Sequence, residues 1–216
     1  MAVAPLNKFL TLAVPVAPGE QAVYSTPVGV SAILLYAQVS NVGIGTTYPK
    51  VTFTHRRKTI STGNIRNNRI IKNGEIPPSD SLVLIDGRLV LERTALISDS
   101  IVISGTQAGI VSITNCKYDN NTGITTVTTS TNHNFNVGDE ITMSGLAFTC
   151  SGTSGLTTTI YPYPQTSFTV TQVIGVTTFV TNAGVIAGIA HTYVSGGQVG
   201  PLQMEFICSI LENSTS

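Results

Sequence analysis

The chain has 216 residues; 42% are hydrophobic, only 10% are charged, and 11 basic residues balance 11 acidic ones. This length fits one large or two small domains, and zero net charge excludes a bulk electrostatic attraction to nucleic acid or a membrane surface. Few charges and no net charge disfavour a soluble free monomer, so we expect a protein that packs against neighbouring chains. A thermostable or secreted β-protein is the alternative.

The sequence predicts no signal peptide and no transmembrane helix. Pro15 and Pro18 interrupt the apolar N-terminal stretch, no basic segment precedes it, and no apolar run reaches roughly 18 residues. The three cysteines, Cys116, Cys150 and Cys208, show neither a CxxC pattern nor zinc-site spacing. We therefore expect buried thiols, and a Cys116–Cys150 bridge stays open.

Short segments rich in valine, isoleucine and threonine, separated by glycine, proline and asparagine, predict an all-β protein. The segment 31–42 begins apolar on both faces, which predicts a central strand covered on both sides. Pro77 and Pro78 cannot donate ladder hydrogen bonds and should lie outside a central strand. Further strands of this first region are expected within 7–16, 21–28, 50–57, 69–85 and 88–104.

The composition changes between Gly105 and Gln198, where threonine, serine and glycine are frequent. The charged residues there are Lys117, Asp119, Asp139 and Glu140. A hairpin is predicted around the turn 119–123, because Asn, Asp and Gly accept left-handed backbone angles at low cost. The segment 144–166 is expected to be a long polar loop, and strands should follow at 167–174 and 177–184.

The last segment, 200–213, alternates apolar residues with polar or charged ones, as the first region does. We therefore predict that the last strand returns to the N-terminal sheet. The predicted fold is an antiparallel, jelly-roll-like β-sandwich of residues 1–104 and 199–216. Residues 105–198 would form an inserted small β-barrel or β-sandwich domain, since insertion between close chain ends is structurally cheap. Two domains in series are the alternative.

The stretch "HNFNVGDEITMSG" places His133, Asp139 and Glu140 close together in sequence, as a metal site or an acid/base pair would. The period of two along a strand turns Asp139 and Glu140 to opposite sides, and no neighbouring ligand set is identifiable. We predict a structural turn in which Asp139 caps backbone N–H groups. No catalytic residue, cofactor or metal is predicted, because nucleophile-elbow and phosphate-loop motifs are also missing.

A basic cluster lies in residues 55–72, which contain no acidic residue. It is expected to contact a partner or to blunt a sheet edge. Nucleic-acid binding is disfavoured, because no aromatic side chains interleave with the basic ones to stack on bases. The basic side chains of the cluster are Arg56, Arg57, Lys58, Arg66, Arg69 and Lys72. All of them except Lys72 are predicted interface residues.

The segment Gly109–Val199 resembles a β-module of structural proteins of tailed phages, especially those of marine cyanobacteria. The shared pattern is a threonine-rich strand, His-x-Phe-x-Val-Gly-Asp at 133–139, a strand, Ser-Gly, a variable loop, and the Phe-Thr-Val and Thr-Phe-Val strands. This chain has Asn134 where such modules commonly have glycine. The first region, with "EQAVYSTPVGVSAILLYAQVSNVG" and the closing "LQMEFICSIL", is similar to small β-sandwich proteins encoded among phage structural genes.

The resemblance implies a multi-copy component of the virion without enzymatic activity. Its partners would be other virion proteins and copies of itself in a homo-oligomer, without direct contact to nucleic acid or membrane. The tail, neck or baseplate is the favoured position, and capsid decoration is the alternative. A receptor- or glycan-binding fibre module is a further alternative, in which sugars would stack on Tyr161, Tyr163 and Tyr193. A hydrolase of surface polysaccharide is the third possibility.

Overall fold

The computed structural model describes residues 7–44, 46–152, 155–160, 166–185 and 190–214, with the backbone alone for 151–152 and 155–160. Within these ranges every regular element is a β-strand, which confirms the all-β prediction. No helix there is long and apolar enough to cross a bilayer. The chain divides into two compact units: Met1–Val16, Glu20–Thr106 and Gln203–Ser216 form the first, and Ala17–Gly19 and Gln107–Leu202 form the second.

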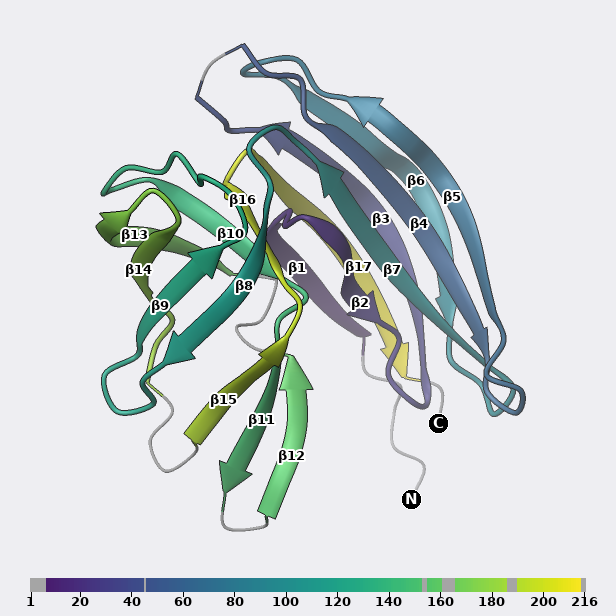
Figure 1. Ribbon diagram of the computed structural model, residues 1–216. Coiled ribbons are helices and arrows are strands. Elements are labelled where there is room, and N and C mark those ends of the chain that lie inside the picture. Colours follow the sequence, from purple (N-terminus) through teal and green to yellow (C-terminus); the bar gives the residue numbers. More distant parts are fainter. Residues whose placement is uncertain (1–6, 45, 153–154, 161–165, 186–189, 215–216) are drawn as a thin grey trace. The chain divides into compact units, whose positions relative to one another are not determined.

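The first unit is a sandwich of two four-stranded sheets, with the orders β1-β17-β3-β6 and β2-β7-β4-β5 (Figure 1). The first strand pairs with the last, the second with the next to last, and so on inward. This nested pairing is the topology of an eight-stranded jelly roll and confirms the predicted sandwich. The strands are β1 (Asn7–Pro15), β2 (Gly19–Ser25), β3 (Val30–Asn41), β4 (Lys50–Thr59), β5 (Ile65–Glu75), β6 (Ser81–Glu92), β7 (Ile97–Thr106) and β17 (Met204–Ser214).

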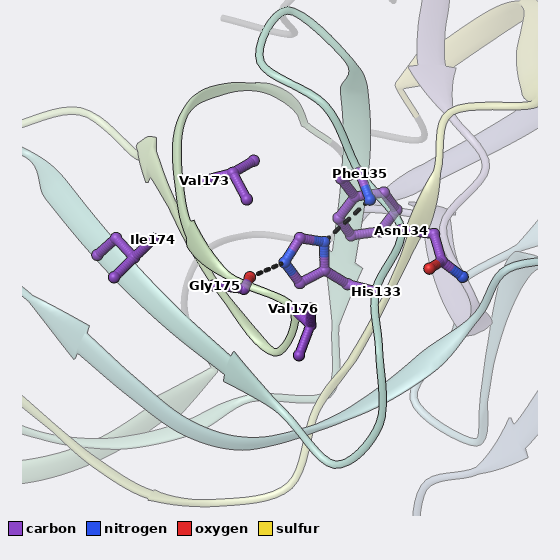
Figure 2. A pocket seen from close by; sticks show the side chains of 7 residues that line it. All are labelled: His133, Asn134, Phe135, Val173, Ile174, Gly175 and Val176. Atoms are coloured by element: carbon purple, nitrogen blue, oxygen red, sulfur yellow. Dashed lines mark hydrogen bonds between the residues drawn. The ribbon is translucent and has the colours of Figure 1, made fainter.

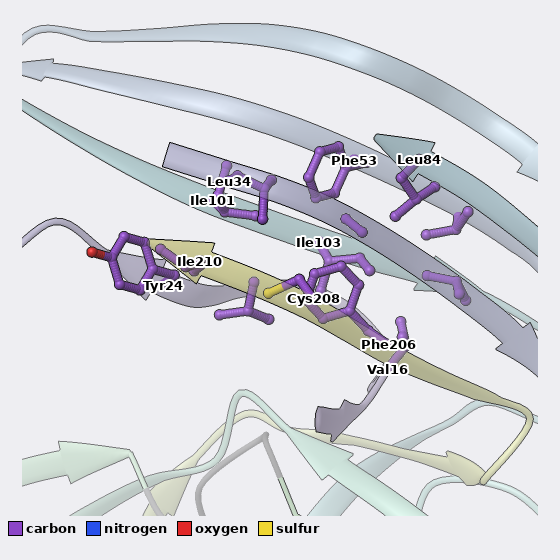
Figure 3. Close-up of a cluster of buried hydrophobic side chains, with 14 of the residues drawn as sticks. Val16, Tyr24, Leu34, Phe53, Leu84, Ile101, Ile103, Phe206, Cys208 and Ile210 are labelled. Atoms are coloured by element: carbon purple, nitrogen blue, oxygen red, sulfur yellow. The ribbon is translucent and has the colours of Figure 1, made fainter. Parts of the chain in front are cut away.

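The sandwich core is built from alternate residues of its strands. On β17 the inward side chains are at most 1% exposed: Met204, Phe206, Cys208 and Ile210. Figure 3 shows Phe206 and Cys208 beside Ile103 and below Phe53, between the two layers. The ring centroids of Phe53 and Phe206 lie 6.1 Å apart. Complete burial of such a ring stabilises the fold by about 1.5–3 kcal/mol.

β3 lies in the middle of its sheet, between β17 and β6, as its apolar sequence predicted. Its inward residues Ala32, Leu34 and Val39 are 0% exposed, but its outward face is only half-buried. Within the single chain, the expectation of a strand covered on both faces is therefore wrong. The physical reason is that the outward positions mix Ile33 with serine, tyrosine and glutamine, whose polar groups are tolerated at a half-buried surface.

The second unit has a nine-stranded sheet with the order β12-β11-β15-β8-β16-β10-β13-β14-β9, and β9 also pairs with β8. This extra pairing closes the six strands from β8 to β9 into a small barrel, as the fold prediction anticipated. β15, β11 and β12 extend the sheet beyond the barrel. The strands are β8 (Val111–Tyr118), β9 (Ile124–Thr129), β10 (Glu140–Ser144), β11 (Ala147–Gly152), β12 (Gly155–Ile160), β13 (Ser167–Gly175), β14 (Thr178–Asn182), β15 (Ala190–Ser195) and β16 (Gln198–Pro201).

Aromatic and branched side chains fill the barrel interior, where Ile141, Met143 and Phe179 are 0% exposed. The three cysteines of the chain are free and buried, which confirms the expectation of buried thiols and leaves Cys116 and Cys150 unbridged. Burial raises the pKa of the Cys116 thiol to about 12, so this thiol stays protonated and unreactive near neutral pH.

The described part of the segment 144–166 departs from the predicted long polar loop, whereas residues 153–154 and 161–165 lie outside the described residues. Residues 147–152 and 155–160 form the antiparallel pair β11 and β12, with Gly152 opposite Gly155 at the hairpin end. The prediction gave too much weight to serine and glycine. Threonine is β-branched and suits a pleated strand, and Phe148 and Cys150 share the buried face of β11.

Candidate functional site

His133 is a buried structural side chain that is 4% exposed. Its Nδ1 accepts a hydrogen bond from the backbone N–H of Phe135 at 2.9 Å, and its Nε2 lies 3.0 Å from the carbonyl oxygen of Gly175 (Figure 2). A proton on Nε2 and none on Nδ1 satisfies both contacts, which assigns the neutral imidazole. The ring also stacks on Phe135 and meets Phe179 edge to face. Both nitrogens are engaged, so neither is available to a metal ion.

Asp139 and Glu140 differ in their contacts and exposure. Oδ2 of Asp139 accepts a hydrogen bond from the backbone N–H of Asn136 at 2.8 Å, which confirms that Asp139 caps the turn. Glu140 is exposed at the start of β10, whereas Ile141 and the other residues of that strand are buried. Among the residues that the structure describes, no group of three or more His, Cys, Asp or Glu side chains could hold a metal ion.

A shallow hollow of about 320 Å³ opens beside His133, under the hairpin that joins β13 to β14. Val173, Ile174 and Val176 line it from the hairpin (Figure 2) and are 38%, 59% and 67% exposed. The lining side chains are apolar apart from His133 and Asn134, and both ring nitrogens of His133 already have partners. The hollow therefore offers apolar surface and no acid/base group.

A charge cluster lies on the inward face of the sandwich, where the register pairs Arg57 on β4 with Asp99 on β7. Nε and Nη2 of Arg57 donate to the two carboxylate oxygens of Asp99 at 2.7 and 2.6 Å. Nη2 also lies 3.1 Å from Glu92, and Nε2 of His55 lies 3.2 Å from Oδ2 of Asp99. The Asp99 side chain is 0% exposed, so these contacts compensate for a charge removed from water.

The pKa of Asp99 shows that the compensation is more than complete. Burial alone would raise this pKa, but the hydrogen bonds from Arg57 and from the backbone N–H of Glu92, together with the nearby His55 imidazole, outweigh burial and hold the pKa below its ordinary value. In return, the hydrogen bond to Asp99 raises the pKa of Arg57 against the opposing effect of its burial. The cluster is an ion pair that holds β4, β6 and β7 together, and its groups already have partners within the chain.

The structure separates the five predicted interface residues into two groups. Arg57 belongs to the buried cluster, and Arg56 forms an ion pair with Glu20 and donates to Asn67. The remaining three are exposed on β4 and on β5, which is an edge strand of its sheet: Lys58, Arg66 and Arg69. The role of Arg57 could not be predicted from residues 55–72, because its acidic partners, Glu92 and Asp99, lie outside this segment.

Of the three tyrosines proposed for glycan contact, Tyr161 and Tyr163 lie outside the described residues. Tyr193 lies on β15, where its ring meets Phe148 edge to face. Its hydroxyl donates to the carbonyl oxygen of Gly196 at 2.8 Å and lies 3.3 Å from that of Ile113. Tyr193 is thus half-buried and packed against the barrel core.

Asp99 and His55 are polar residues of the sandwich that the sequence analysis did not single out. The signal was present in the strand parity, because Asp99 shares the inward parity of β7 with Ile101 and Ile103. An acidic residue at a core position calls for a buried cationic partner. The partner itself could be found only from the register between β4 and β7.

Comparisons with known proteins yield few matches. No protein-family model and no curated relative matches the chain. Among solved structures, a chain in the structure of the infectious bursal disease virus Gx strain is similar to this one. The match covers 97% of this chain and 41% of the viral chain, at 8% identity and a TM-score of 0.34. The STIV MCP matches 97% of both chains at 8% identity and a TM-score of 0.24.

A third structure, the N-terminal CBM22-1-CBM22-2 tandem domain of Paenibacillus barcinonensis Xyn10C, matches 98% of this chain and 92% of its own, at 9% identity and a TM-score of 0.25. The chain spans about two fifths of the length of the infectious bursal disease virus protein. Scores this low do not establish a common fold, and no functional inference follows from them.

Proposed function

We propose that this protein is a structural component of a virus particle, present in several copies and without catalytic activity. The jelly-roll topology of the first unit is the observation that carries the proposal. Eight-stranded jelly rolls build viral capsid domains, although lectin and cupin domains use them too. Because a fold alone does not define a function, the choice among these classes rests on the sequence resemblance of residues 109–199 to a β-module of phage structural proteins.

The polar groups of the described residues support a structural class over a cupin-like or hydrolytic one. His133 and Asp139 hold the turn before β10, and Arg57 and Asp99 hold the sandwich strands together. Each of these side chains already has a hydrogen-bond or ion-pair partner within the chain. A building block used in many copies is attached by repeated weak contacts that add up. Such a protein needs an ordered fold more than it needs free acid/base groups.

The finer placement is part of the same proposal and rests on the sequence resemblance. We place the protein on the tail, neck or baseplate of a tailed phage, and capsid decoration is the alternative. The exposed basic residues Lys58, Arg66 and Arg69 on the β4–β5 hairpin supply a surface for an acidic neighbouring virion protein. Charge complementarity of this kind sets the orientation of docking more than its strength.

Quantitative mass spectrometry of purified particles tests the proposal. The particles should come from the virus that encodes the chain, and an antibody against the recombinant protein should locate it by immunogold labelling. We expect a fixed copy number per particle. A value of about a dozen or fewer, with label on the tail or neck, matches the low symmetry of those parts, whereas many more copies with label on the shell indicate decoration. Expression in infected cells without incorporation into particles would contradict a virion role.

A further inference from the structure

The outward face of the β1-β17-β3-β6 sheet carries an apolar row that crosses all four strands. The register places Phe9 opposite Leu211, Leu211 opposite Ile33, and Ile33 opposite Val90. Phe9 is 74% exposed and Val90 is 53% exposed. Single exposed apolar side chains are ordinary on a protein surface, but a continuous row indicates a surface that another molecule covers.

A second row crosses the same face four residues further along β1. Ala13 lies opposite Ile207, Ile207 opposite Gln38, and Gln38 opposite Val83. Ile207 and Val83 are 41% and 45% exposed. A hollow of about 250 Å³ opens on this part of the face, and its lining includes Ala13, Pro15, Ser40, Glu205 and Ile207. The face thus carries a protruding phenylalanine at one end and a hollow at the other.

The row between these two consists of Thr11, Ser209, Tyr36 and Asp86. The polar side chains of β3 on this face already satisfy one another: the hydroxyl of Tyr36 donates to Gln38, and the amide of Gln38 donates to Ser40 at 3.1 Å. Covering these groups costs less than covering polar groups that still need water. Asp86 is the one charged residue of the three rows, and it lies on the edge strand β6.

We infer that this face is the contact surface for a second copy of the same chain, related by a two-fold axis that runs along the middle row. Phe9 precedes Thr11 by two residues and Ala13 follows it by two, so the axis places Phe9 of one copy over the hollow at Ala13 and Ile207 of the other. The same operation brings Leu211 onto Ile207 and Val90 onto Val83 of the second copy. Such a contact is isologous, because one surface supplies both the knob and the hole.

The area of the face is sufficient for such a pair. Four strands about 4.8 Å apart and about nine residues long, at about 3.4 Å per residue, cover roughly 600 Å². Two copies then bury about 1,200 Å², which is the lower end of the range for specific, stable interfaces. A partner with a different surface would need its own matching knob and hole, whereas a second copy already has both.

The inference deepens the proposed function, since a multi-copy virion component needs contacts between copies. It can nevertheless be tested on the purified chain without any particle. If the chain forms the dimer in solution but is absent from particles, the proposed contact is supported and the virion role is rejected. A chain that is incorporated into particles but stays monomeric in solution at millimolar concentration would reject this contact and retain the virion role.

Sedimentation equilibrium of the full chain over a range of concentrations tests the contact. We expect a monomer–dimer equilibrium that Phe9→Ser weakens at least tenfold, because the two-fold contact loses the aromatic side chain that covers the hollow twice, once on each copy. Asp86→Asn should strengthen the dimer several-fold, since the axis sets the two Asp86 carboxylates against each other. Leu96→Ser is the matched control: Leu96 is 69% exposed but lies outside the three rows, so dimerisation should not change.

Cross-linking tests the position of the axis. Thr11 of one copy faces Thr11 of the other, so Thr11→Cys should be joined by a bismaleimide linker of about 10 Å, the separation of two packed sheets. The chain's own cysteines are buried and should not react. Leu96→Cys should give no cross-linked dimer. A dimer that Phe9→Ser leaves intact, or that cross-links equally through residues 11 and 96, would overturn the proposed contact.

Discussion

The sandwich and the barrel use the same kind of strand but fix their buried polar groups in different ways. In the sandwich, the ion pair of Arg57 with Asp99 crosses from β4 to β7, supported by His55 and Glu92. In the barrel, hydrogen bonds of uncharged side chains to the backbone join the strands and turns instead. His133 joins the turn before β10 to Gly175, and Oγ1 of Thr181 donates to the carbonyl oxygen of Thr169 at 2.8 Å.

This difference follows from composition, because the residues between 105 and 198 include only four charged ones. A buried ion pair is strong only while both charges are present, so its contribution depends on pH. Hydrogen bonds between groups that do not titrate, such as the one from Thr181 to Thr169, contribute about 1 kcal/mol each and do not depend on pH. The two units should therefore respond differently to the same perturbation.

The largest expected effect comes from the aromatic cores and asks whether the units are energetically separate. Phe206→Ala in the sandwich and Phe179→Ala in the barrel should each cost about 3–5 kcal/mol, because each empties a fully buried site. Hydrogen exchange read strand by strand should show lost protection only in the unit that carries the substitution. Equal loss in both units after either change would show that they unfold together.

Asp99→Asn should cost the sandwich about 1–3 kcal/mol, because it removes the buried carboxylate that accepts from Arg57 and from the backbone N–H of Glu92, although Arg57 keeps its contact with the Glu92 side chain. Urea unfolding of the sandwich, followed by the exchange of β4 and β7 amides, measures the loss. Arg69→Gln is a suitable control, since Arg69 is exposed on β5 and should change stability little. If Asp99→Asn is as stable as the parent chain, the charge cluster does not hold the strands.

Acid should weaken the sandwich through Asp99. The folded-state pKa of Asp99 lies below its unfolded value of about 3.9, so its stabilising contribution is present above that pH and is lost as the pH falls through the folded-state value. We expect the sandwich to lose stability as the pH falls below about 4, and this loss should shrink in Asp99→Asn. In the barrel, Asp119 also has a lowered pKa through the hydrogen bonds from the turn, but it is exposed and solvent weakens its effect.

The parity of the strands predicted most of the fold. The alternation along β17 assigned the last strand to the N-terminal sheet, and that strand lies between β1 and β3. The turn at Asp139 was also predictable, because the capping contact reaches only three residues back, to Asn136. Local sequence patterns carry information of this short range.

The rest depended on contacts between distant parts of the chain. Arg57 and Asp99 are separated by 42 residues, and only the register of β4 against β7 joins them. The hairpin of β11 and β12 was missed because serine and glycine obscured a threonine-rich strand pattern. The outward row of Phe9, Leu211, Ile33 and Val90 comes from four strands, so no single segment shows it.

The smallest expected effect concerns His133 and tests the neutral chemistry of the barrel. His133→Phe keeps the ring packing on Phe135 and Phe179 but leaves the N–H of Phe135 and the carbonyl of Gly175 without their side-chain partner, which should cost about 1–2 kcal/mol. The melting of the barrel in the variant and in the parent measures this cost. Asn134→Gly is the neighbouring control, because Asn134 has a φ of 57° that glycine adopts more easily, so its stability should be equal or slightly higher.

Adding Zn²⁺ tests whether His133 is a purely structural residue or a metal ligand. If the imidazole only bridges Phe135 and Gly175, added Zn²⁺ or a chelator should leave the melting temperature of the parent chain unchanged, because a ligand that binds the folded state would raise it by mass action. A rise with Zn²⁺ that disappears in both His133→Phe and Asp139→Asn would instead identify a metal site. The unchanged outcome would leave the two hydrogen bonds and the ring packing on Phe135 and Phe179 as the contribution of His133 to the barrel, the counterpart of the ion pair that Asp99 provides in the sandwich.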